Sequence, residues 1–159
     1  MRLAPLLAVL LLAACSPAKP PAYSSAGIAV AEPFSRPAPA GGTGAGFFSV
    51  TNNNTGPDGL VAVESPIAGK VQMHETSTAG GMMRMEELKD GVPFKAGQTV
   101  VFQPGGKHVM FIGLTRPLKA GDRIPATLVF RNAGRAPIEL VVRGGSGMSG
   151  MVGMSHHDH

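Results

Sequence analysis

Short runs of hydrophobic residues that alternate with polar ones recur along the chain between about residues 27 and 143. Examples are "LVAVE" (60–64), "KVQMHE" (70–75) and "TLVFRNAGRAPIELVV" (127–142). Gly, Pro, Asn and Asp separate these runs at intervals of about 8–12 residues, which is the spacing of a Greek-key sandwich or barrel. Since no helical periodicity extends beyond about two turns, the pattern predicts an all-β domain of about eight or nine short strands.

The turn residues also predict how some strands connect. We expect one hairpin over 98–114 with its turn at Pro104–Gly106, and another over 126–144 that turns at Asn132–Ala136. Residues 76–81 are expected to form a loop. The following segment, 82–88, alternates as a short strand, although its residues also permit one helical turn.

The two ends of the chain have a different composition from the domain. Residues 1–14 combine Arg2 with an apolar run too short to span a bilayer, as in a secretory signal peptide. Leu12-Ala13-Ala14-Cys15 resembles the bacterial lipobox, so we expect lipidation of Cys15 and anchoring to a membrane of the cell envelope, on its periplasmic side. The alternative is an ordinary signal peptide. Residues 15–26 are expected to be a tether, 27–143 the domain, and 144–159 a disordered tail.

Composition and charge exclude several functions. The formal charge is +4, but Lys and Arg are scattered singly without interleaved aromatic residues, which argues against nucleic-acid binding. Cys15 is the only cysteine, so the domain has no thiol nucleophile, and no Ser/His/Asp pattern is present. We therefore expect a monomer that is not an enzyme.

The histidines and methionines are concentrated in two regions. Within the domain they are Met73, His74, Met82, Met83, Met85, His108 and Met110, and in the tail they are Met148, Met151, Met154, His156, His157 and His159. A single methionine is usually core filler. The combination of both residue types at compatible positions nevertheless favours a binding site.

Strand geometry predicts which of these side chains meet. His108 and Met110 are two residues apart, so they share one face of a strand. His74 ends one strand and Met85 lies on the next, across the expected 75–81 loop. Met83 shares the face of Met85 if that segment is extended, whereas Met73 points away from His74 and is expected in the core.

A set of imidazoles and thioethers is suited to a soft ion. Ca²⁺ and Mg²⁺ prefer carboxylates, and Zn²⁺ rarely accepts methionine. Cu(I) accepts tetrahedral nitrogen and sulfur ligation, and methionine supplies sulfur that cannot form a disulfide outside the cytosol. We therefore interpret His108 and Met110 as half of a Cu(I) site, to which His74 and Met85 on the neighbouring hairpin can contribute a second imidazole and a second thioether.

At this point the sequence resembles a known family. His74, ten residues, Met85, a further 22 residues and then His108-x-Met110 are similar to the H-x10-M-x21–22-H-x-M motif of the periplasmic PCu(A)C copper chaperones. The flanking segments "LVAVESPIAGKVQMHET" and "GVPFKAGQTVVFQPGGKHVMFIGLTRPLKAGD" agree, and the resemblance extends from about Gly27 to Arg143.

The resemblance implies a cupredoxin-like β-sandwich in which His74, Met85, His108 and Met110 bind Cu(I). It also implies delivery of copper to the binuclear centre of cytochrome c oxidase, on subunit II or through a Sco-type protein. The tail is interpreted as a second site, for Cu(II) or a further Cu(I). The alternative is a solubilising tail.

The same residues argue against one competing function and leave two others open. A blue-copper electron-transfer protein requires a Cys ligand that this domain lacks. Copper sequestration for tolerance uses the same ligands as delivery, so the sequence leaves it open. An interaction module without metal remains a third alternative.

Overall fold

The structure, a computed structural model, describes residues 22–144, and strands make up its regular structure. These strands are β1 (Tyr23–Ser25), β2 (Ile28–Ser35), β3 (Thr43–Asn52), β4 (Asp58–Glu64), β5 (Ala68–Ala79), β6 (Met82–Glu87), β7 (Val92–Phe94), β8 (Thr99–Phe102), β9 (Lys107–Leu114), β10 (Arg123–Phe130) and β11 (Arg135–Val142). Residues 22–144 contain no helix, and hence no membrane-spanning one. The prediction of an all-β domain is confirmed, with more strands than expected.

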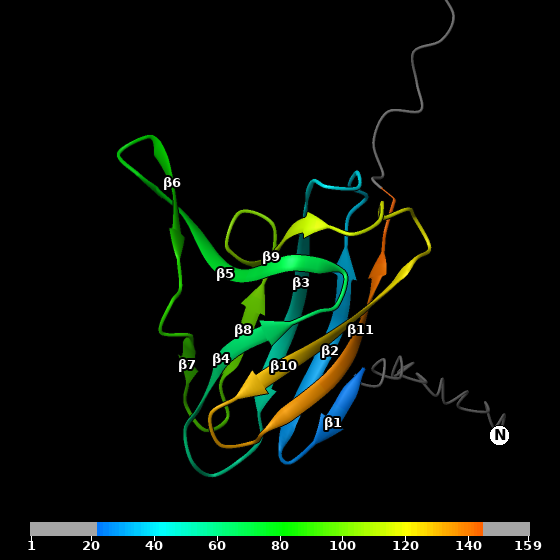
Figure 1. Ribbon diagram of the computed structural model, residues 1–159. Helices are drawn as coiled ribbons and strands as arrows, with labels where there is room; N and C mark the ends of the chain where they lie inside the picture. The colour runs from blue at the N-terminus through cyan, green and yellow to red at the C-terminus, as the bar shows by residue number, and fades with distance from the viewer. Residues whose placement is uncertain (1–21, 145–159) are drawn as a thin grey trace, which may run out of the picture.

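The strands form one mixed sheet in the order β6-β5-β9-β8-β3-β2-β11-β10-β4-β7, with β1 paired to β2. The sheet folds over on itself, because one hydrophobic cluster combines residues from distant strands, such as Val50 of β3, Leu60 of β4, Phe111 of β9 and Leu128 of β10. Figure 1 shows β4 and β10 crossing in front of β2 and β3. The core therefore lies between two layers of a single rolled sheet.

Alternation in the sequence explains which face of each strand is buried. In β10, Ile124, Ala126, Leu128 and Phe130 are buried while the residues that alternate with them are partly or fully exposed. A strand with this period presents every second side chain to the core. The β10–β11 hairpin follows the prediction, with antiparallel register from Arg123↔Val141 to Val129↔Arg135.

The predicted hairpin over 98–114 is wrong. Strands β8 and β9 run in the same direction and pair one after the other with β3, through Phe48↔Phe102 and Gly46↔Val109. Residues 103–106 form a tight excursion between them, closed by hydrogen bonds from the Gly106 N–H to the Gln103 carbonyl and from the Gln103 N–H to the Lys107 carbonyl. The Pro-Gly-Gly turn therefore separates two strands, β8 and β9, that pair in succession with β3, and the chain keeps its direction through the turn.

One segment expected to be a loop is mostly strand, and the segment for which a short strand or a helical turn was expected is a strand. Strand β5 continues to Ala79, so the predicted 76–81 loop shrinks to the turn at Gly80 and Gly81, whose φ angles are +61° and +77°. Residues 82–87 form strand β6 and not a helical turn. Strand β1 uses Tyr23–Ser25, three residues of the segment that composition assigns to the tether.

A buried carboxylate connects β4 to the β10–β11 turn. The Asp58 Oδ1 accepts hydrogen bonds from the N–H groups of Gly59 at 2.7 Å and Asn132 at 2.9 Å, and its Oδ2 accepts one from Ala133 at 2.9 Å. Asp58 is among the buried polar residues of the domain. Backbone donors from β4 and from the β10–β11 turn thus satisfy a charge that would otherwise be costly to bury.

Candidate metal site

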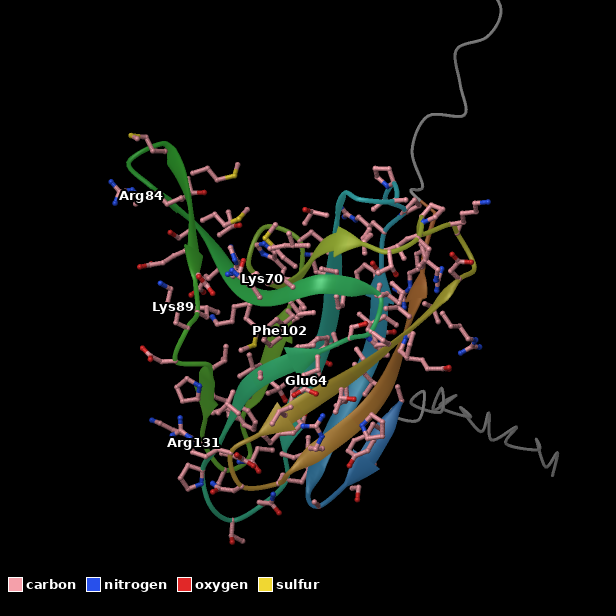
Figure 2. The ribbon with its side chains drawn as sticks, in the orientation of Figure 1. Glu64, Lys70, Arg84, Lys89, Phe102 and Arg131 are labelled. Atoms are coloured by element: carbon pink, nitrogen blue, oxygen red, sulfur yellow. The ribbon has the colours of Figure 1, made fainter. Side chains whose placement is uncertain are left out.

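The β5–β6 hairpin projects from the body of the domain, as Figure 1 shows. The two glycines at its tip adopt the positive φ values that a two-residue hairpin turn requires. Residues 82–86 of β6 are exposed, so this strand makes little contact with the core. Figure 2 shows Arg84 at the outer end of the hairpin, pointing away from the domain. The hairpin is therefore an arm whose two faces are both open to solvent over most of its length.

Strand register places the four candidate ligands on one face. His74 of β5 lies opposite His108 of β9, and Gln72 lies opposite Met110. On the other side of β5, Thr76 lies opposite Met85 of β6. Residues directly opposite each other in a sheet point to the same face, as do positions two apart. The adjacent strands β6, β5 and β9 thus carry His74, Met85, His108 and Met110 on a common face, which we call the ligand face.

Met73 and Val109 show where the other face of these strands points. Both are buried, with 6% and 0% of their surface exposed, and both belong to the hydrophobic cluster. Met73 therefore packs in the core, as expected from its position next to His74. The ligand face is the outer face of the sheet at this point.

The His108 ring is held in a defined orientation. Its Nδ1 lies 3.0 Å from the Gly106 carbonyl oxygen, and because a carbonyl only accepts, Nδ1 must carry the proton. The same oxygen accepts a hydrogen bond from the Thr76 N–H at 3.1 Å, which fixes the turn against β5. The neutral ring therefore has its lone pair on Nε2, the arrangement found in many metal-binding histidines.

The His74 ring lacks hydrogen-bond partners. Both of its ring nitrogens are buried and neither has a partner within the part of the chain that the structure describes. Its ring centroid lies 6.0 Å from that of His108, with an angle of 41° between the planes. Leaving a buried polar group unpaired costs roughly 1–3 kcal/mol. A coordinated ion would satisfy one of these nitrogens.

The two methionines of the candidate site differ in exposure. Met85 on the arm is 57% exposed, whereas Met110 is half-buried beside His108. Thioether sulfur and neutral imidazole nitrogen are ligands that a soft cation accepts. The set fits an ion of this type, held by buried nitrogen donors on one side and an accessible sulfur on the other.

A carboxylate that sequence reasoning missed also lies on the ligand face. Glu87 of β6 is opposite His74, and its Oε1 accepts a hydrogen bond from the Gln72 Nε2 at 2.6 Å. Only the register of β6 places this side chain there, because twelve residues separate it from His74 in the sequence. Its negative charge favours a cation on this face.

Glu75 faces the opposite way from His74, because neighbouring residues of a strand point to opposite faces. Its Oε1 accepts a hydrogen bond from the Lys107 Nζ at 2.6 Å, and the two side chains are partly exposed. This ion pair connects β5 to the start of β9, next to the two histidines.

Comparison with known proteins places the fold in a defined class. The structure resembles the copper-bound PCuAC domain from PmoF2, with a TM-score of 0.63 and 27% identity over 77% of this chain and 97% of that chain. It also resembles the solution structure of CuI-DR1885 from Deinococcus radiodurans, with a TM-score of 0.54 and 27% identity over 70% of this chain and 76% of that chain. The fold is therefore the cupredoxin-like β-sandwich of a PCu(A)C domain, and both the resemblance and the expected fold class are confirmed.

The family follows from the sequence comparison. The model of the family described as "Putative lipoprotein LpqE-like" matches residues 28–142. A relative from Leifsonia xyli subsp. xyli, described as "Putative lipoprotein Lxx21020", is 36% identical over 130 residues, which are 82% of this chain and 78% of the relative. This chain belongs to the LpqE-like family.

Several candidate residues lie outside the described part of the chain. They are Cys15 near the N-terminus and, in the tail, Met148, Met151, Met154, His156, His157 and His159. The signal peptide over 1–14 and the tail over 144–159 stay predictions.

Proposed function

We propose that this protein is a copper chaperone that binds Cu(I) through His74, Met85, His108 and Met110. The observation that carries the proposal is the His74 ring, whose buried nitrogens have no partner among the described residues, beside His108 on a surface that also presents two thioethers. The copper-bound structures of two similar proteins support the same cargo. The proposal assigns no catalytic chemistry to the chain.

The ligand set is suited to carrying an ion and releasing it. All four ligands are neutral, so a bound Cu(I) keeps its charge and remains attractive to an anionic or thiolate acceptor. The buried His108 and the buried ring nitrogens of His74 hold the ion, while the exposed Met85 is the ligand that an acceptor can reach first. Handover then proceeds by exchange of one ligand at a time, without a change in the oxidation state of copper.

An equilibrium titration tests the proposal. The full chain is titrated with Cu(I) against a chromophoric Cu(I) chelator of known affinity, beside His74→Ala and His108→Ala variants. We expect tight binding that each substitution weakens by about a hundredfold or more, or about 2.7 kcal/mol. Met73→Leu is the matched control, because Met73 adjoins His74 but faces the core. Equal binding by all four proteins would refute the site.

The destination that we propose is the copper centre of cytochrome c oxidase, reached on subunit II or through a Sco-type thiol protein. It rests on the resemblance to the PCu(A)C chaperones. The alternative is sequestration for copper tolerance, which the same ligands would serve. Loss of oxidase activity in a deletion strain, restored by added copper, supports delivery, whereas copper sensitivity without an oxidase defect supports sequestration.

We also propose that the chain is lipid-anchored through Cys15 on the periplasmic side of the cell envelope. The motif around Cys15 and the descriptions of the family and of the relative as lipoproteins support this location. Metabolic labelling with a palmitate analogue should mark the wild type and leave Cys15→Ser unlabelled. Labelling of both proteins would contradict the anchor.

The tail is proposed as a second copper site. Its methionines suit Cu(I) and its histidines suit Cu(II). Copper stoichiometry of the full chain should fall when Met148, Met151 and Met154 become Leu and His156, His157 and His159 become Ala. An unchanged stoichiometry would leave the tail with a solubilising role only.

A further inference from the structure

Met83 is a third sulfur donor on the ligand face, in addition to Met85 and Met110. It lies opposite Thr78 in the β5–β6 register, two residues beyond Met85 toward the tip of the arm. Because positions two apart on a strand share a face, Met83 and Met85 point the same way. Met82 and Arg84 occupy the other face of β6, and Figure 2 shows Arg84 directed away from the domain.

Met83 has no structural role in the core. Its side chain is 78% exposed, more than the 57% of Met85, and the β5 residues opposite the two sulfurs are threonines, Thr78 and Thr76. Methionine usually fills gaps in hydrophobic cores. At Met83 there is no core to fill, so packing does not explain the thioether.

Distance along the strand separates Met83 from the proposed resident site. His74 lies opposite Glu87, four residues from Met83, which corresponds to about 13 Å along β6. An ion held between the two histidines is therefore out of reach of Met83. Met83 and Met85 are only about 7 Å apart at their backbones, and two flexible thioethers at that spacing can bind the same ion.

Exposure decreases in order along this face. It falls from 78% at Met83 through 57% at Met85 to 8% at His108. A donor or acceptor molecule approaching the arm therefore meets Met83 first, then Met85, and reaches the imidazoles last.

We infer that Met83 is a transfer ligand for Cu(I), used during loading and release but absent from the final coordination sphere. This inference rests on the proposed function. In loading, a Met83 Sδ–Cu bond forms as a bond from copper to the donor breaks. Bonds to Met85 and then to the histidines form next, and the Met83 bond breaks. Copper stays Cu(I) throughout, no proton needs to move, and release follows the reverse order.

The strand supplies a matched control for the test. Met83→Leu and Met82→Leu each replace one exposed thioether of β6 with a similar apolar side chain, but only Met83 is on the ligand face. Both variants are made in the full chain, and again in a full chain whose tail carries Met148→Leu, Met151→Leu and Met154→Leu. Stopped-flow absorbance follows Cu(I) transfer from each loaded protein to bathocuproine disulfonate, and loading from the Cu(I)–bicinchoninate complex. An equilibrium competition gives the Cu(I) affinity of each variant.

We expect Met83→Leu to slow both transfers by about fivefold or more while its equilibrium affinity stays within about twofold of the wild type. Met82→Leu should match the wild type in both measurements. Equal rates for the two variants would overturn the inference. A tenfold loss of affinity in Met83→Leu would also overturn it, since Met83 would then be a resident ligand. Failure of the wild type to bind Cu(I) would instead refute the proposed function itself.

Discussion

His74 and His108 face each other across strands β5 and β9, with their ring centroids 6.0 Å apart. The His108 ring is fixed by a hydrogen bond to the Gly106 carbonyl, whereas the buried His74 nitrogens have no partner within residues 22–144. A fold that needed these rings only for packing would gain from apolar side chains, because an unpaired buried donor or acceptor is costly. The pair is therefore best explained by a ligand that both rings bind.

Replacement of His74 by leucine should separate stability from binding. His74→Leu removes two unpaired buried nitrogens, so the free energy of unfolding of the copper-free protein should stay the same or rise by about 1 kcal/mol. Urea unfolding with a Cu(I) chelator present measures this. Adding Cu(I) should then stabilise the wild type more than His74→Leu, by about 2.7 kcal/mol for a hundredfold loss of affinity. A large loss of stability in the copper-free variant would indicate a structural role for the imidazole.

The two thioethers should contribute to binding and little to stability. Met85→Leu and Met110→Leu are each expected to lower Cu(I) affinity by about tenfold, or about 1.4 kcal/mol. Because leucine and methionine have similar volumes, the stability of the copper-free protein should change by less than about 1.5 kcal/mol. Competition titrations and urea unfolding measure the two effects. Met73→Leu is the control from the opposite face, and an affinity loss as large as in the other two variants would contradict the assigned face.

Glu87 should tune the affinity of the site through its charge. Glu87→Gln keeps a side chain that can still pair with Gln72 but removes the negative charge opposite His74. We expect Cu(I) affinity to fall by roughly threefold at low salt, since partly exposed charge interactions contribute about 0.2–1 kcal/mol. The difference should shrink as ionic strength rises, because salt screens exposed charges. If the affinity of the variant is unchanged at low salt, the carboxylate has no electrostatic role.

Substitution of Asp58 should lower the free energy of unfolding without changing the candidate metal site. Asp58→Asn replaces one acceptor oxygen with an NH₂ group, which leaves at least one of the three backbone donors in the turn unpaired. We expect a loss of about 1–3 kcal/mol in the free energy of unfolding. Cu(I) affinity should not change, because the candidate ligands are on β5, β6 and β9, whereas Asp58 is on β4 and bonds to the β10–β11 turn. A parallel fall in affinity would show that the two regions are coupled.

The sequence predicts part of the ligand face correctly because the spacing of residues within a single strand determines which side chains share a face. The spacing of His108 and Met110 fixes their common face once the segment is a strand, and the opposite orientation of Met73 follows from the same period. The β10–β11 hairpin is predictable for a similar reason, since its turn residues and its alternation agree. The structure confirms each of these arrangements.

Pairing between distant strands is not predictable in this way. The Pro104–Gly106 turn has the composition of a hairpin, but the ten-residue length of β3 lets β8 and β9 pair with it in succession. Likewise, the polar residues at 76–78 indicate a loop, although they extend β5 along the exposed arm, where no side chains need to pack in a core. Glu87 is beside His74 only because of that extension. Local composition carries no information on these tertiary contacts.

X-ray absorption spectroscopy of the Cu(I)-loaded protein tests the central claim most directly. The measurement compares the full chain with a full-length variant whose tail histidines and methionines are replaced, and with His108→Ala in that variant. The account predicts that copper is coordinated by both nitrogen and sulfur. The tail substitutions should leave this coordination unchanged, and His108→Ala should abolish it. Sulfur-only coordination, or a spectrum that His108→Ala leaves unaltered, would contradict it.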